Sequence, residues 1–157
     1  MCISIHRGRK RGAVTVEMAL VAPLLIFLLF AIVEFGVLMR DVISVHEAAR
    51  EGARVAAVGA TIETTGARTA SAIFPLDAAQ AQVVLEYRAW DFDTGTWGSW
   101  QTLANAGPLN CALAGDQVRV SVAYPHQIMT AGLFGDWSDD GESGIRTVYA
   151  ATMMRRE

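Results

Sequence analysis

The sequence has few of the residues that metal sites, disulfide frameworks and nucleic-acid surfaces require. Its 157 residues include two Cys, three His and one Lys. It has neither a glycine-rich phosphate-binding motif nor cysteines and histidines at metal-ligand spacing. The positive charges cluster only near the N-terminus and acidic residues prevail afterwards, so nothing indicates nucleic-acid binding. We therefore expect a protein that is not an enzyme and has no cofactor, metal, nucleic acid or small-molecule substrate.

Charge is also absent from a long N-terminal stretch, residues 18–33. The wider apolar run, 13–39, is interrupted only by Glu17 and Glu34. At about 1.5 Å per residue this wider run crosses a hydrocarbon core of roughly 30 Å. A basic cluster precedes it, and Lys and Arg remain on the cytoplasmic side. The sequence thus predicts one membrane span, with the N-terminus cytoplasmic and the bulk of the chain extracytoplasmic.

The junction between the basic cluster and the apolar run bears on how the N-terminus is processed. A conventional signal peptide has a shorter apolar stretch that ends in a small-x-small cleavage site, and no good site of this kind occurs near residues 31–36. An uncleaved signal anchor fits the composition. The order of residues at the junction favours another processing route, because Gly12 ends the basic segment and Glu17 is the fifth residue after it.

This junction resembles the class III leader that prepilin peptidases cut. Two further blocks follow, at residues 34–36 and at the helix motif of Ala48, Ala49, Arg50, Glu51, Gly52, Ala53 and Arg54. Together with residues 11–23 they resemble the TadE-like family of minor pseudopilins of the tight adherence (Flp) pilus system. The resemblance implies cleavage between Gly12 and Ala13. The three parts would then be a leader (1–12), a transmembrane and amphipathic helix (13–58) and an extracytoplasmic domain (59–157).

Three residues in or next to the apolar run have specific roles under this hypothesis. Gly12 leaves the leader side of the scissile bond without a side chain, although it also fits a flexible joint. Glu17 is costly in a membrane unless it is paired, and the resemblance implies a partner in the N-terminus of a neighbouring subunit. The alternative is that Glu17 lies at the headgroup level. Pro23 removes one helical hydrogen bond and predicts a kink.

Cleavage would also change the charge and the cysteine content of the product. Removing Arg7, Arg9, Lys10 and Arg11 changes the formal charge from −3 to −7. Cys111 would then be the single cysteine, either as a small apolar side chain or in an intermolecular disulfide.

Beyond the apolar run the helical pattern continues, and after Gly59 it changes to that of a small domain. Apolar residues at helical spacing extend the helix to about Val58, and Gly59 is its predicted stop. Residues 61–66 resemble a loop and residues 67–74 a short helix. Four strands follow, at 82–90, 97–103, 117–124 and 146–153, and the first two form a hairpin. The predicted fold is α+β, a long N-terminal membrane-spanning helix that continues into a pilin-like domain with a small antiparallel sheet.

Two local clusters each allow a binding interpretation. Aromatic residues surround the predicted hairpin, at Trp90, Phe92, Trp97 and Trp100, and fit either sugar stacking or cross-strand packing. The acidic segment 136–142 offers oxygen ligands for calcium, but its spacing is not that of an EF-hand, so a solvated loop is the simpler interpretation.

The sequence therefore predicts a minor pilin or pseudopilin that acts by inter-subunit packing in the inner (cytoplasmic) membrane, with incorporation into the extracellular pilus as a further option. The partners implied by the resemblance are prepilin peptidase, other pseudopilins, the major pilin, the membrane assembly platform and the lipid bilayer. The alternative is an uncleaved, membrane-tethered binding or adhesin-like module that uses the tryptophan hairpin.

Overall fold

A computed structural model describes residues 9–130, 138, 139, 141 and 143–157 of the chain. The chain divides into two compact units, Met1–Val37 and Leu38–Glu157. The acidic segment 136–142 falls largely outside the described residues. The interpretation of this segment as a solvated loop therefore stays a prediction.

One long helix, α1 (Arg9–Ala57), contains the whole apolar run. It is long and apolar enough to cross a membrane by length and composition. Pro23 lies inside α1 without ending it, and the kink there stays a prediction. In Met1–Val37 the large apolar side chains are mostly exposed, for example 74% for Leu20 and 66% for Leu24.

Helix α1 ends where the sequence predicts, because Gly59 adopts a positive φ of 89°. The Gly59 N–H donates to Ala56 O at 3.0 Å, and the Ala60 N–H donates to Val55 O at 3.3 Å. This pair of bonds satisfies the last carbonyl groups of the helix in the Schellman arrangement, which requires a left-handed residue.

The second helix, α2 (Ile62–Ala72), corrects the expectation of a loop over residues 61–66. Thr61 caps α2, its side chain accepting a hydrogen bond from the Thr64 N–H at 3.3 Å. Asn105 also accepts from the Ile62 N–H at 2.8 Å. These two contacts satisfy N–H groups that a helix start exposes, so the threonine-rich stretch becomes helical.

The sheet of Leu38–Glu157 has four antiparallel strands in the order β4-β1-β7-β8. They are β1 (Gln82–Arg88), β4 (Gln101–Thr102), β7 (Gln117–Gln127) and β8 (Ile145–Arg155). Two short hairpins are separate from it, β2 (Trp90–Asp91) with β3 (Thr96–Trp97), and β5 (Asn105–Ala106) with β6 (Leu109–Asn110). A short 3-10 helix, η1 (Ala78–Gln80), precedes β1. The α+β prediction is confirmed.

All four predicted strands have different bounds in the structure, and two of the differences have a clear cause or consequence. The strand expected over 97–103 is divided into β3 and β4, and the latter pairs with β1 to complete the predicted hairpin. Strand β7 continues three residues past its predicted end at Tyr124, through Pro125. Pro125 is tolerated because pairing with β1 ends at Ala123, so no neighbouring strand requires a bond from its nitrogen.

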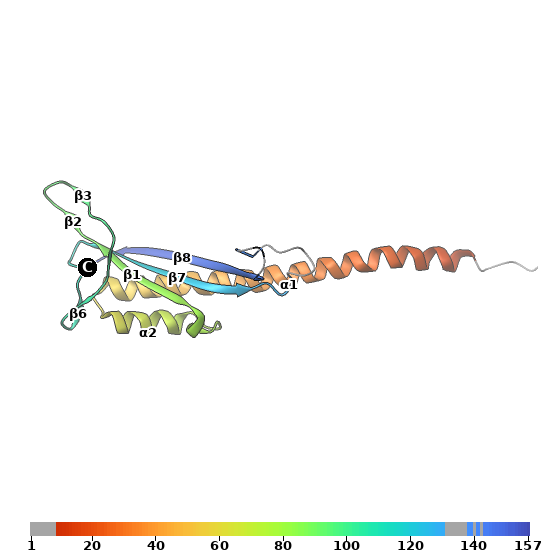
Figure 1. Cartoon of the computed structure of the whole chain (residues 1–157), viewed down its shortest axis with the longest axis horizontal. Helices are drawn as coiled ribbons and strands as arrows, with labels where there is room; N and C mark the ends of the chain where they lie inside the picture. The colour runs from red at the N-terminus through yellow and green to blue at the C-terminus, as the bar shows by residue number, and fades with distance from the viewer. Residues whose placement is uncertain (1–8, 131–137, 140, 142) are drawn as a thin grey trace, which may run out of the picture. The chain divides into compact units, whose positions relative to one another are not determined.

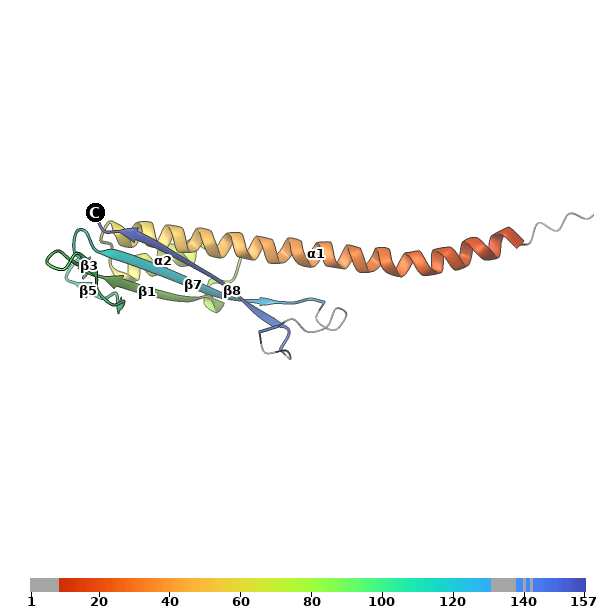
Figure 2. The same ribbon diagram turned by 90° about the horizontal axis from the view of Figure 1, so that it is seen from above.

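Both helices pack on one face of the sheet in Leu38–Glu157 (Figures 1 and 2). Val118, Val120 and Val122 alternate along β7 and are fully buried. Small residues of α1 cover them, and Ala48, Ala49 and Ala53 are likewise fully buried. The alternation predicted from the sequence therefore identifies the inner face of the sheet.

Candidate functional site

The predicted processing residues lie at the start of α1. Gly12 has no atom within 4 Å of the position that a Cβ would occupy, and Glu17 is exposed. Ala13 belongs to the same helix. Cleavage between Gly12 and Ala13 would require this first part of the helix to become extended. The cleavage and the pairing of Glu17 stay predictions.

The helix motif from Ala48 to Arg54 divides into two faces. Ala48, Ala49, Gly52 and Ala53 are buried, whereas Arg50 and Arg54 are exposed. Gly52 is required by close packing, because a Cβ there would collide with Thr69 Oγ1 on α2 and lie 3.0 Å from Val120 Cγ1 on β7. The small residues of the motif thus bring α1 into contact with both α2 and the sheet.

The charged face of the motif forms the wall of a groove. Glu47, Arg50, Glu51 and Arg54 line this groove together with Met154 of β8, and its volume is about 300 Å³. Arg54 donates two hydrogen bonds to Glu51, from Nε at 2.9 Å and from Nη2 at 2.8 Å. These bonds hold the pKa of the Glu51 carboxyl below its usual value. We call this feature the α1–β8 groove.

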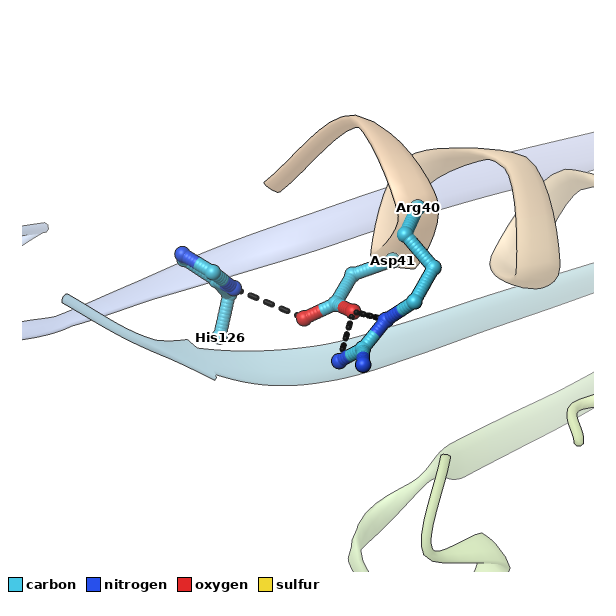
Figure 3. A network of polar contacts seen from close by, with 3 residues as sticks. All are labelled: Arg40, Asp41 and His126. Carbon is cyan, nitrogen blue, oxygen red and sulfur yellow. Dashed lines mark hydrogen bonds and ion pairs between the residues drawn. The ribbon is translucent and has the colours of Figure 1, made fainter. Parts of the chain in front are cut away.

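A buried polar contact that sequence reasoning missed joins α1 to β7 (Figure 3). Asp41 Oδ2 lies 2.7 Å from His126 Nδ1, and both side chains are at most 4% exposed. Arg40 donates to the other oxygen, Oδ1, from Nε at 3.0 Å and from Nη2 at 2.8 Å. A carboxylate so deeply buried requires such partners.

Two local features hide this contact in the sequence, because His126 directly follows Pro125, which favours a loop, and Asp41 comes just after the apolar run. In the structure, His126 continues the alternation of Val118, Val120 and Val122 along β7, and its side chain faces inward like theirs. Extending this period of two past Tyr124 would have predicted that His126 is buried. Glu34, which interrupts the apolar run, is also buried, at 3% exposure.

The aromatic cluster matches the packing interpretation. Trp90 and Trp97 are opposite each other in the β2–β3 hairpin, with ring centroids 4.7 Å apart. Arg88 lies over Trp97 at 5.0 Å and over Trp100 at 4.7 Å, and Arg119 lies over Trp100 at 4.1 Å. These cation–π contacts occupy the rings within the domain. Phe92 is the exception, at 79% exposure.

Neither Cys111 nor the acidic side chains form a metal site in the described residues. Cys111 is half-buried against the core, and its Sγ accepts a hydrogen bond from the Ala104 N–H at 3.4 Å. Within the described part of the chain, no three His, Cys, Asp or Glu side chains are arranged to hold a metal ion. Cys111 therefore packs as the small apolar side chain of the simpler interpretation.

Comparison with known proteins gives one match. A family model described as TadE-like protein matches residues 12–54. Neither the curated proteins nor the solved structures contain a match to the chain. The matched segment begins at Gly12 and includes the apolar run, the buried Asp41 and the helix motif. Residues 12–54 are thus TadE-like in sequence, and they lie in the helix that is long and apolar enough to cross a membrane.

Proposed function

We propose that the chain is a minor pilin or pseudopilin of a tight-adherence (Flp) pilus, cut by prepilin peptidase between Gly12 and Ala13. The observation that carries this proposal is the TadE-like match, which starts at Gly12 and continues through the apolar helix. The protein acts through contacts between subunits and not through catalysis.

The exposed apolar surface of α1 supports a role in packing. In residues 14–33 most large side chains are between 40% and 74% exposed. In water this surface would be strongly unfavourable, and it is covered either by lipid or by helices of other subunits. The proposed partners are other pseudopilins, the major pilin, the assembly platform and the cytoplasmic membrane that the helix spans.

Glu17 is the residue that links processing to assembly in this proposal. Cleavage creates a cationic α-amino group on Ala13, four residues before Glu17 in α1. A carboxylate in the apolar layer is stabilised when it pairs with such a cation, on its own or on a neighbouring subunit. An uncleaved binding module has less support, because the tryptophan rings contact each other and Arg88 and Arg119.

The first test is the intact mass of the protein recovered from cells with and without prepilin peptidase. We expect a chain that starts at Ala13 only when the peptidase is present. Gly12→Val blocks the cut because it places a branched side chain at the scissile bond, whereas Gly36→Val, in the same helix, does not. A chain that keeps residues 1–12 in both strains contradicts the proposal and restores the signal-anchor alternative.

The second arm separates processing from assembly. Glu17→Gln is expected to leave the mass of the mature chain unchanged and to abolish piliation and recovery of the other pilus subunits. Glu63→Gln, at an exposed glutamate on α2 outside the α1–β8 groove, serves as the control. Normal piliation with Glu17→Gln would show that this residue has no assembly role.

A further inference from the structure

Strand β8 forms one edge of the sheet. The backbone N–H and C=O groups of its successive residues point alternately to β7 and to the open side. The Arg156 N–H donates to Asp116 O at 2.7 Å, and the Ile128 N–H donates to Gly144 O at 2.8 Å. At both ends of the ladder, therefore, even-numbered residues bond to β7. Because alternate residues of a strand point to opposite sides, the odd-numbered residues of β8 direct their N–H and C=O groups to the open edge.

The two ends of this open edge are closed by the chain itself. Near the start of β8, Asp139 donates from its N–H to Ile145 O at 3.0 Å and accepts from the Thr147 N–H at 2.7 Å. Beyond its end, the Glu157 N–H donates to Ala57 O at 3.1 Å. Between these points, Tyr149, Ala151, Met153 and Arg155 have no backbone partner on this side within the described residues. The unpaired segment is seven residues long.

The surroundings of this segment differ on the two faces of the sheet. On the outer face, Tyr149 and Met153 are apolar and exposed, at 59% and 55%. On the inner face lies the α1–β8 groove, whose wall of Glu47, Arg50, Glu51 and Arg54 alternates in charge. A strand placed beside β8 would have alternate side chains on an apolar surface and on a charged one.

We propose that an extended segment of another protein chain binds here as a fifth strand, paired with residues 149–155. Its chemistry is fixed by the two faces. Apolar side chains contact Tyr149 and Met153, and alternate acidic and basic side chains contact the charges of the groove. Its backbone bonds to the open N–H and C=O groups of β8, as in β-strand addition.

A second copy of this chain does not fit the edge. Along α1, Asp41 contacts His126, which is opposite Arg146 of β8, and Ala57 contacts Glu157. Helix α1 thus runs in the same direction as β8 (Figure 2). Symmetric β8–β8 pairing would be antiparallel, and the two chains would enter their domains from opposite ends. Two subunits anchored in one membrane cannot do so, a step that rests on the proposed function. The opposite edge, β4, has only two residues.

The test uses the full-length chain in detergent micelles and a fluorescent nine-residue probe peptide in which valine alternates with glutamate and arginine. Ala151→Pro removes one N–H that faces the open edge and keeps the bonds to β7. We expect it to weaken probe binding at least tenfold, whereas Ala151→Thr keeps the N–H and binds as the wild type. Reversing the charges of the groove with Glu47→Arg and Arg50→Glu together is expected to weaken binding severalfold.

Failure of the probe to bind the wild-type chain, or equal binding by the Ala151→Pro variant, overturns the inference. Self-association of the wild-type chain that Ala151→Pro abolishes overturns it too, because the occupant would be a second copy. Circular dichroism verifies that the variants are folded. Ala151→Pro is expected to leave the mature mass unchanged in cells, so a failed processing test and a failed binding test are distinguishable.

The same edge can be examined in the native assembly by amide hydrogen exchange. We expect the amides of Tyr149, Ala151 and Met153 to exchange at least tenfold more slowly in pilus assemblies recovered from cells than in the purified chain. Equal exchange rates in the two samples contradict the inference.

Discussion

Leucine and valine have opposite environments in the two units of this chain. In Met1–Val37, Leu20 and Leu24 are 74% and 66% exposed, although this segment contains the longest apolar run. In Leu38–Glu157, Val118, Val120 and Val122 are fully buried under α1. The large apolar side chains of the first unit are mostly exposed, whereas those of the second unit form a buried core. The TadE-like match extends from one into the other and ends at Arg54.

Position within α1 therefore decides what a substitution does. A change among the exposed side chains before Leu38 leaves the domain core intact, whereas a change at a buried position after Leu38 alters that core. All four tryptophans follow Leu38 in the sequence, so tryptophan fluorescence reports unfolding of the second unit alone. Urea denaturation of the full chain in detergent, followed by this fluorescence, measures each effect below.

The largest effect is expected for the buried contact of Asp41. Asp41→Ala removes the partner of His126 and Arg40 and should lower the free energy of unfolding by about 3–5 kcal/mol, as for other buried charged contacts that lose one member. His46→Ala, at an exposed position on the same helix, should change it by less than about 0.5 kcal/mol. An equally small effect of Asp41→Ala would mean that this contact does not stabilise the domain.

The same substitution at two glycines of α1 compares the units directly. Gly52→Ala forces α1 away from Thr69 and Val120, and overpacking of this kind costs about 1–3 kcal/mol. Gly36→Ala meets no atom within 4 Å and should leave the unfolding of the domain unchanged. If both variants unfold like the wild type, the close approach at Gly52 is not required.

The smallest effect concerns pH. The hydrogen bond from Asn105 lowers the pKa of the Glu63 carboxyl from its usual 4.5. A lowered folded pKa stabilises the domain above the unfolded value, and this contribution is lost as the pH falls through the folded value. The stability difference between wild type and Glu63→Gln should therefore shrink as the pH falls below about 5 and through the lowered pKa of Glu63. A difference independent of pH would exclude this linkage.

Periodic features of the fold could be predicted from the sequence. The uncharged run predicted α1, Gly59 predicted its end, and alternation at Val118, Val120 and Val122 predicted β7 and its buried face. These signals are local, because each depends on residues within a few positions of one another.

Contacts between distant segments could not be predicted in this way. Asp41 and His126 are 85 residues apart, and Asn105 reaches the start of α2 across 43 residues. Without the Asn105 contact, the threonines and glycine of residues 61–66 favour a loop on local preference alone. The α1–β8 groove could not be predicted for the same reason, because Met154 and Arg50 come from distant segments and line one groove only in the folded domain.

The capped end of α1 determines where a mechanical load would pass. Asn110 Nδ2 donates to Ala56 O and Ala60 O at 2.8 and 2.9 Å, and Arg156 Nη1 donates to Ala57 O at 3.2 Å. A pull on α1 along its axis is therefore shared between the β5–β6 hairpin and the residues that follow β8, and the short connection to α2 does not carry it alone. Because α1 and β8 run in the same direction, such a pull slides α1 along β8. Their contacts are then loaded all at once and do not break one after another.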